Sequence, residues 1–291
     1  MKKIKRFTVF TPTFNRAHLI HRVFDSLTSQ SFRDFEWIII DDGSTDNTEN
    51  LINSYIENSD IEIRYIKKEN AGKVSAINDA LLLAKSEWFI VFDSDDWCDN
   101  NALELIDQEI NSIPDAEYAS YGAVSVLKRG LDGCVIGDDY SKISKYGKSY
   151  VDRLILGIKG DKWEIIKTDI HRKYRYELQE NEKYMAPSYS WLMLSSQYKT
   201  IFVNKDLSTI EYQEDGISRN NIKHRVGSSN TTAFYYKSIA GILKGGFIKN
   251  KMLINYYRFK MHSKQKNKLG FLSLLASFLY FFDLYKMRKL K

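Results

Sequence analysis

The first 97 residues alternate short apolar runs with segments of helical periodicity, and this alternation limits the possible folds more than any other feature. The apolar runs stop abruptly at polar residues, as in FTVFTPT, FEWIIIDD and WFIVFDSDD. A segment between them, AHLIHRVFDSLTSQ, places apolar residues three and four positions apart, which is typical of an amphipathic helix. Strands that alternate with helices at this pace predict a parallel sheet with crossover helices.

We therefore expect an α/β fold with a Rossmann-like mixed, mostly parallel sheet and helices on both faces. Ser44 or Thr45 is expected to cap the second helix. Beyond residue 115 the pattern is less regular, and AEYASYGAVSVL reads as strand. The predicted strands are 6–14, 35–44, 61–70, 87–97 and 199–204, and the predicted helices are 17–30, 44–56, 73–86 and 189–198, with further helical stretches in 230–246 and 269–291.

Composition supports a globular protein. The 291 residues are 43% apolar with only three prolines, which favours a substantial core over disorder. Cys98 and Cys134 have no metal-ligand spacing, so a reducing cytosol is the simplest compartment. The lysine-rich start precedes an apolar run that is short and broken by polar residues, and we expect a strand there and not a signal peptide.

Charge is distributed unevenly. Residues 1–218 carry 27 Lys and Arg against 36 Asp and Glu, whereas residues 219–291 carry 16 against one. We expect three parts, which are residues 1–110, residues 111–218 and a basic helical appendage at 219–291. The cationic end predicts an anionic partner. Nucleic acid would be repelled by the acidic residues that follow the predicted strands. An anionic membrane surface is therefore the favoured partner of the basic end.

The run LGFLSLLASFLYFFDLY near the C-terminus is too short and too interrupted to span a bilayer. A weakly polar stripe of Gly270, Ser273, Ser277 and Tyr280 favours a helix that lies in the headgroup layer. The alternative is a helix packed on the body or on a second subunit. The expected location is cytoplasmic, at the inner face of the cell membrane.

Carboxylates crowd the end of the strand at 87–97. Asp93, Asp95 and Asp96 follow an apolar run directly, and like charges this close repel unless a cation or water accommodates them. Mg²⁺ and Mn²⁺ prefer such oxygen ligands and bind through one or two carboxylates plus phosphate oxygens. A solvated acidic loop is the alternative, but the position at a strand end favours a metal site.

Other polar residues follow the neighbouring strands. Asp41 and Asp42 can accept hydrogen bonds from a base or a ribose, Asn15 and Arg16 offer polar contacts, and Lys73 can reach a phosphate. Because ligands of parallel α/β sheets bind beyond the carboxyl ends of the strands, these side chains are expected to share one crevice. A plain turn is the alternative for Asp42, and a solvated lysine for Lys73.

The blocks TPTFNR, WIIIDDGSTDNT and KKENAGKVSAINDALLLAKSEWFIVFDSDD together resemble family 2 glycosyltransferases, the inverting enzymes of the GT-A fold. The resemblance covers about residues 5–110 and implies that residues 1–110 bind the donor and residues 111–218 bind the acceptor. It implies transfer of a sugar from a nucleoside diphosphate sugar, most often UDP-linked, with Mg²⁺ or Mn²⁺. By position, the implied nucleotide and donor contacts are Pro12, Thr13, Asn15, Arg16, Asp41, Asp42, Lys73 and Ser94, and the implied metal ligands are Asp93, Asp95 and Asp96.

Residues 160–218 are similar, more weakly, to the acceptor half of bacterial capsule and cell-wall polysaccharide transferases, which implies a glycan or lipid-linked acceptor. Such an enzyme needs a general base for the acceptor hydroxyl. Glu182 is the first candidate, Glu180 the second and Asp215 the third. Pro187 stands where relatives often have a carboxylate, so a catalytically inactive nucleotide-sugar-binding relative is one alternative. A nucleotidyltransferase is another, although TPTFNRAHL lacks the glycine-rich loop that it would need.

Overall fold

The computed structural model describes residues 4–213, 216, 221–263 and 270–289. The chain folds into two compact units. Unit 1 comprises Met1–Arg175 and Leu194–Glu211, and unit 2 comprises Tyr176–Met193 and Tyr212–Lys291. The division expected from the sequence, at residues 110 and 218, is a functional one and stays a prediction.

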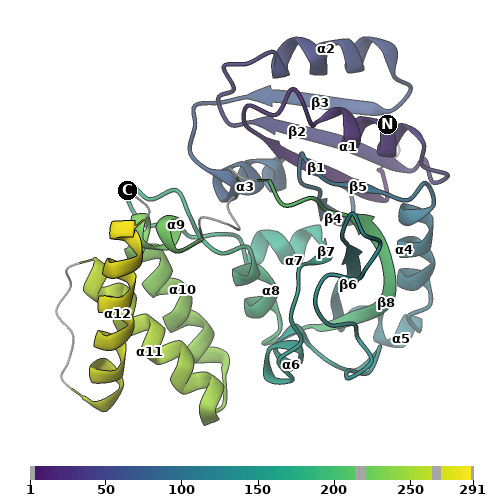
Figure 1. Cartoon of the computed structure of the whole chain (residues 1–291). Coiled ribbons are helices and arrows are strands. Elements are labelled where there is room, and N and C mark those ends of the chain that lie inside the picture. The colour runs from purple at the N-terminus through teal and green to yellow at the C-terminus, as the bar shows by residue number, and fades with distance from the viewer. Residues whose placement is uncertain (1–3, 214–215, 217–220, 264–269, 290–291) are drawn as a thin grey trace. The chain divides into compact units, whose positions relative to one another are not determined.

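Unit 1 is built on one eight-stranded sheet in the order β3-β2-β1-β4-β7-β6-β8-β5 (Figure 1). The pairs β2–β3, β1–β2, β1–β4 and β6–β8 are parallel, and the pairs β4–β7, β6–β7 and β5–β8 are antiparallel. The predicted mixed, mostly parallel sheet is therefore confirmed. The strands are β1 (Phe7–Thr13), β2 (Phe35–Asp41), β3 (Glu62–Lys67), β4 (Trp88–Val91), β5 (Trp97–Cys98), β6 (Tyr121–Arg129), β7 (Lys162–Lys167) and β8 (Lys199–Thr209).

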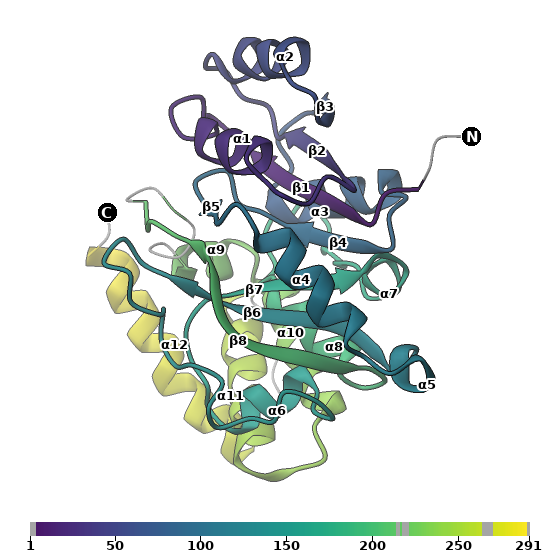
Figure 2. The same ribbon diagram turned by 90° about the vertical axis from the view of Figure 1, so that its right-hand side faces the viewer.

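Helices cover both faces of this sheet, as Figure 2 shows for α1 and α4 against α3 and α7. Successive side chains of β1 point to opposite faces. Phe7 and Val9 belong to the core cluster that α1 and α4 complete, and Phe10 stacks on Phe89 of β4. The helices of unit 1 are α1 (His21–Thr28), α2 (Thr48–Asn58), α3 (Lys73–Leu83), α4 (Ala102–Asn111), α5 (Asp115–Tyr118), α6 (Tyr150–Ile155) and α7 (Thr168–Lys173).

The sequence placed β1 to β3 and α1 to α3 correctly, whereas the predicted strand 87–97 ends at Val91, and α4, α6, β7 and α7 were not predicted. One correction concerns AEYASYGAVSVL, which we expected to be strand throughout. Its first residues form the short helix α5, and β6 begins only at Tyr121. Pro114 precedes α5, and its fixed φ suits the start of a helix.

Unit 2 is helical. α10 packs beside α11, where the ring of Tyr236 stacks on Phe259 at 5.7 Å, and α11 packs beside α12. Helices were predicted in 230–246 and 269–291, whereas α9 and α11 were not. The apolar residues of α11 lie all around the helix and give no regular stripe. The helices are α8 (Ser188–Leu194), which ends at the unit boundary, α9 (Asn221–Gly227), α10 (Ser229–Ile242), α11 (Gly246–His262) and α12 (Phe271–Lys289). No helix among the described residues is long and apolar enough to cross a membrane.

Candidate active site

The carboxyl ends of β1, β2 and β4 lie side by side at one edge of the sheet. Thr13 pairs with Asp41 in the parallel register, and the backbone N–H of Asp42 donates to the carbonyl of Thr13 at 2.8 Å. The backbone N–H of Phe92 donates to the carbonyl of Phe10, also at 2.8 Å. The loops that follow these strands therefore start from one edge, as the sequence predicted.

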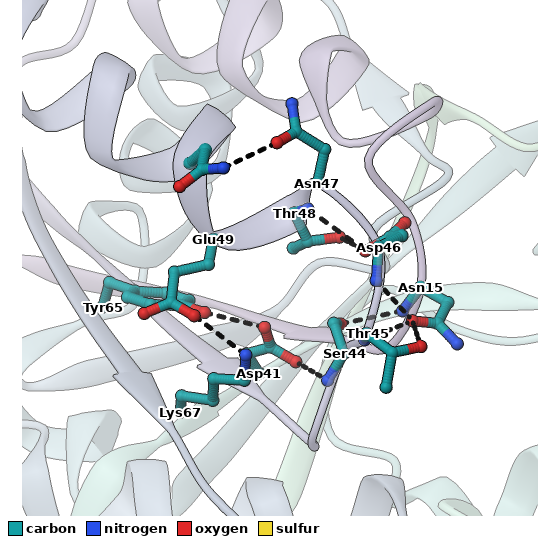
Figure 3. A network of polar contacts seen from close by, with 11 residues as sticks. Asn15, Asp41, Ser44, Thr45, Asp46, Asn47, Thr48, Glu49, Tyr65 and Lys67 are labelled. Atoms are coloured by element: carbon teal, nitrogen blue, oxygen red, sulfur yellow. Dashed lines mark hydrogen bonds and ion pairs between the residues drawn. The ribbon is translucent and has the colours of Figure 1, made fainter.

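The loops after β1 and β2 are joined by a network around Asn15 (Figure 3). Asn15 has a φ of 52°, a left-handed conformation that asparagine tolerates. Its N–H donates to Ser44 Oγ at 2.8 Å, and its Oδ1 accepts the N–H of Thr45 at 2.8 Å. The prediction that Ser44 or Thr45 caps α2 is therefore wrong. The N-cap residue is Asn47, whose side chain makes no capping bond. Asp46, one residue earlier, accepts the N–H of Thr48 through its Oδ1 at 3.1 Å, and its carboxylate stabilises the helix start.

Asp41, at the end of β2, is fully buried. One carboxylate oxygen accepts the N–H of Ser44 and the other accepts the hydroxyl of Tyr65, both at 2.7 Å (Figure 3). Burial, and next the hydrogen bond to Asp41, raise the pKa of Tyr65. Both oxygens of Asp41 thus hold protein groups, and its first role in this structure is to fix the β2–α2 loop.

Asp42 holds the loop before α3 in the same way. Its two carboxylate oxygens accept the N–H groups of Ala71 and Gly72, at 2.8 and 2.7 Å. Gly72 has a φ of 92°, which a side chain would strain. Because paired backbone N–H groups are strong donors to a carboxylate, Asp42 fixes the point at which α3 begins. Lys73 is the first residue of that helix.

Two lysines neutralise part of the acidic loop after β4. The Lys73 ammonium binds the carboxylate of Asp93, and the Lys128 ammonium binds Asp96 at 2.6 Å. The second pair is buried, with 10% of the Lys128 side chain and 6% of the Asp96 side chain exposed. Among the described residues Asp95 makes no ion pair.

The three aspartates differ in their acidity. Burial would raise the pKa of Asp93, but the Lys73 and Lys128 ammonium groups hold it below its usual value. Burial, and next the Asp93 carboxylate, raise the pKa of Asp95. Burial raises the pKa of Asp96 to about 7, although Lys128 acts in the opposite direction. The loop therefore has three carboxylates beside two lysines, and the remaining negative charge attracts a cation.

Asp93 and Asp95 have carboxylate oxygens of the kind that a divalent cation prefers. Among the described residues there is no group of three or more acidic, histidine or cysteine side chains that could hold a metal alone. Mg²⁺ and Mn²⁺ do not require such a cage, since one or two carboxylates and phosphate oxygens suffice. Asp96 fits less well because its carboxylate is occupied by a buried lysine.

Other predicted donor contacts lie at the same edge. Ser94 is buried within the acidic loop, and Pro12 is the partly exposed residue of β1 that pairs with Ile40. The Arg16 guanidinium is close enough to act on Asp95, whose pKa it lowers, more weakly than Asp93 raises it. The buried hydroxyl of Thr13 makes no hydrogen bond with any described residue.

Lys128 is a residue of the site that the sequence analysis missed. It lies in β6, far along the chain from the acidic loop. The available signal was a lysine within the otherwise apolar run GAVSVLKR, because a charge inside a buried strand needs a partner. Nothing in the local sequence identifies Asp96 as that partner.

The candidate bases lie in unit 2. Glu182 accepts the backbone N–H and the side-chain amide of Asn230, at 2.9 and 3.0 Å, and the N–H of Thr231 at 2.6 Å. This carboxylate stabilises the N-terminus of α10. Glu180 is exposed to solvent. Asp215 lies outside the described residues.

Part of the chain is similar in sequence to known proteins. Residues 8–125 match the family described as glycosyl transferase family 2. Chondroitin synthase of Pasteurella multocida is 37% identical over 141 residues, which is 48% of this chain and 14% of that protein. The GalNAc(5)-diNAcBac-PP-undecaprenol beta-1,3-glucosyltransferase of Campylobacter jejuni is 27% identical over 204 residues, or 69% of this chain and 62% of that protein. The chain therefore spans only part of the length of either relative.

The fold also matches solved structures. TarS from S. aureus in complex with UDP-GlcNAc superposes with a TM-score of 0.62 at 19% identity, covering 88% of this chain and 72% of that chain. This likeness confirms the expected GT-A fold.

Proposed function

We propose, from the match of residues 8–125 to glycosyl transferase family 2, that this chain is an inverting glycosyltransferase in surface polysaccharide synthesis. It transfers a sugar from a nucleoside diphosphate sugar, UDP-linked, to a glycan or lipid-linked acceptor. The observation that carries the proposal is the single sheet edge at which four loops are tied together, with a cation-attracting carboxylate pair at one end. The family match favours this reaction over nucleotidyl transfer.

The nucleoside contacts come from the loops of β1 and β2. Pro12, Thr13 and Asn15 lie on the first loop, and the unpartnered hydroxyl of Thr13 is available to a ligand. Asp42 retains oxygen lone pairs beyond its two hydrogen bonds, which a ribose or base can use. Asp41 is fully buried and contributes by holding the β2–α2 loop. Their protein contacts also preorganise the loops, which lowers the entropic cost of binding.

The diphosphate contacts come from the acidic loop and its neighbours. Lys73, Arg16 and Ser94 supply donors for phosphate oxygens. Mg²⁺ or Mn²⁺ held by Asp93 and Asp95 would neutralise the diphosphate as it leaves. Asp96, paired with Lys128, supports this loop from the buried side.

Calorimetric titration of UDP in the presence of Mn²⁺ tests the donor site. We expect Asp95→Asn to lower UDP affinity to the level that the parent chain shows in EDTA. Asp60→Asn is the matched control. The Asp60 side chain is 76% exposed, and its ion pair with Arg33 is a long surface contact of 3.7 Å. Full UDP affinity in Asp95→Asn, or no effect of EDTA on the parent, would contradict the metal role. A screen of UDP- and GDP-sugars for hydrolysis then identifies the donor.

The inverting reaction also needs a group that removes the proton of the acceptor hydroxyl as the new bond forms. Glu182 remains the first candidate and Glu180 the second. The three N–H contacts of Glu182 give it a structural role as well, so any test of this residue must separate catalysis from folding. A chain that binds nucleotide sugars and has no base would be the inactive relative.

We further propose that residues 219–291 attach the protein to an anionic membrane surface at the cytoplasmic face. Sixteen basic residues against one acidic residue make this region strongly cationic. A basic segment of this kind is attracted to anionic lipid by about 1 kcal/mol for each Lys or Arg near the surface. The name of the Campylobacter jejuni relative includes a diphosphate-linked undecaprenol, which supports a lipid-linked acceptor here.

A further inference from the structure

Helix α12 of unit 2 has its apolar side turned outward. Ser273, Ala276 and Asp283 are buried, at 6%, 0% and 1% exposure. The outward residues recur at steps of three and four and are large and apolar. They are Phe271, Leu274, Phe278, Phe281, Phe282 and Tyr285, with exposed fractions of 74%, 60%, 69%, 66%, 52% and 56%. In a helix that only completes a core, the apolar stripe would face inward.

A buried ion pair fixes this orientation. Asp283 accepts hydrogen bonds from the guanidinium of Arg258, with its Nε at 2.7 Å, and lies 2.9 Å from His262 Nε2. Both partners are on α11, and the ring of Tyr280 lies 4.7 Å from that of His262. A rotation of α12 that buried the phenylalanines would separate Asp283 from these partners. Because a buried ion pair that loses one partner is strongly destabilising, the outward stripe is a fixed feature of α12.

The stripe itself carries no charge. Between Phe271 and Tyr285 the sequence has one charged residue, Asp283, and it is buried. Lys286 follows at the border of the stripe, where its ammonium lies 4.8 Å from the centre of the Phe282 ring. An uncharged aromatic surface with lysine at its border matches the interfacial layer of a bilayer, in which rings enter the acyl boundary and lysines reach the headgroups.

Charge also decides between possible partners. A second copy of the chain would bring another region of 16 basic residues and one acidic residue alongside the first, and the two would repel. Anionic lipid has the opposite charge. We therefore propose that the outward face of α12, from Phe271 to Tyr285, inserts into the interfacial layer of a membrane that contains anionic lipids. This insertion rests on the membrane attachment proposed above and identifies the surface that makes it. It does not depend on the transfer reaction.

Co-sedimentation of the full chain with vesicles tests this insertion. Phosphatidylcholine vesicles with and without phosphatidylglycerol are compared at low and high salt. We expect the parent to bind the anionic vesicles, with a part of the binding that persists at high salt because apolar insertion is not screened. Phe278→Ser combined with Phe281→Ser should remove that part and lower vesicle affinity about tenfold or more. Leu131→Ser, at a residue of unit 1 that is 64% exposed, is the matched control and should bind like the parent.

The outcomes separate the two membrane proposals. If the double variant loses only the salt-resistant binding, insertion by α12 is supported. If it binds like the parent at both salt concentrations, α12 does not insert, whereas salt-sensitive binding would still support the electrostatic contact. Light scattering tests the rival partner, a second copy of the chain. A parent that is dimeric and does not bind vesicles, together with a monomeric double variant, would overturn the proposal. In a Phe278→Trp chain, quenching by brominated lipid above that of the parent is expected, and its absence would also overturn insertion.

Discussion

His171 should make unit 1 sensitive to acid. It lies on α7 with 1% of its surface exposed, and its ring meets Phe89 of β4 edge-on at 5.6 Å between centres. Burial lowers the pKa of His171 to about 3. Because β4 leads directly into Asp93, a charge on His171 would disturb the strand that presents the acidic loop.

The magnitude follows from linkage. The pKa of His171 in the folded chain lies below the value of about 6.5 that an unfolded histidine has, so the neutral form stabilises the fold above pH 6.5. This contribution is lost as the pH falls from there through the folded pKa. Between pH 7.5 and pH 5 the unfolded state gains about 2 kcal/mol relative to the folded state from this one group.

Urea unfolding at these two pH values, followed by tryptophan fluorescence, measures the effect. Trp37, Trp88 and Trp163 are buried in unit 1 and report its unfolding. We expect the parent to lose about 2 kcal/mol more stability than His171→Phe between pH 7.5 and pH 5. His171→Gln, which also carries no titratable group, should behave like His171→Phe.

Another buried group works in the opposite direction, so the comparison with the parent is essential. Burial raises the pKa of Glu164 to about 7. Its contribution to stability is therefore present at low pH and lost as the pH rises through 7. The parent and both variants share Glu164, so its effect cancels in the difference between them. Equal losses of stability in the parent and in both His171 variants would refute the reasoning.

Three further substitutions test the candidate site. Lys128→Met should lower the free energy of unfolding in urea by about 3–5 kcal/mol because it leaves Asp96 buried without its partner. Adding Asp96→Asn to the same chain should restore most of this stability. A double variant that is no more stable than the single variant would contradict the pairing. Asp42→Asn should cost about 1–3 kcal/mol and weaken UDP binding, because an amide group would face a backbone N–H; unchanged UDP affinity would argue against loop preorganisation. Glu182→Gln should lower turnover by about 10²–10⁴-fold at unchanged UDP affinity if this residue is the base, whereas a lower melting temperature with a normal pH profile would leave it only its role at α10. Full turnover in Glu182→Gln together with a loss in Glu180→Gln would move the assignment to Glu180.

The fold of the first hundred residues could be predicted because its determinants are local. β1, β2 and β4 are largely buried and read as short apolar runs, and each crossover helix has its own apolar stripe. β3, at the edge of the sheet, is only partly buried. The pairing of β7 between β4 and β6 could not be predicted in this way. It depends on contacts between residues that are distant in the chain, as in the pair of Ile90 with Ile165.

The candidate site divides along the same line. That Asp42 and Asp95 would lie at one sheet edge follows from the geometry of parallel strands, whatever their individual contacts. Which groups they bind does not follow. The N–H donors that hold Asp42 belong to the loop before α3, and the lysine that holds Asp96 comes from β6. Such pairings depend on tertiary packing, and the sequence identifies only that a buried charge needs some partner.

The sequence pattern of α12 alone does not decide which of its two faces is buried. The spacing of Ser273 and Tyr280 indicated a polar stripe. The sequence favoured contact of this helix with a membrane, and it did not exclude packing on the body. In the structure α12 packs on α11 through that polar side, and its apolar side faces outward. The deciding contact is Asp283 with Arg258 and His262, which lie about twenty residues earlier in the chain. Periodicity therefore defines the two faces of a helix, and the partner of one buried charge decides which face the surroundings meet.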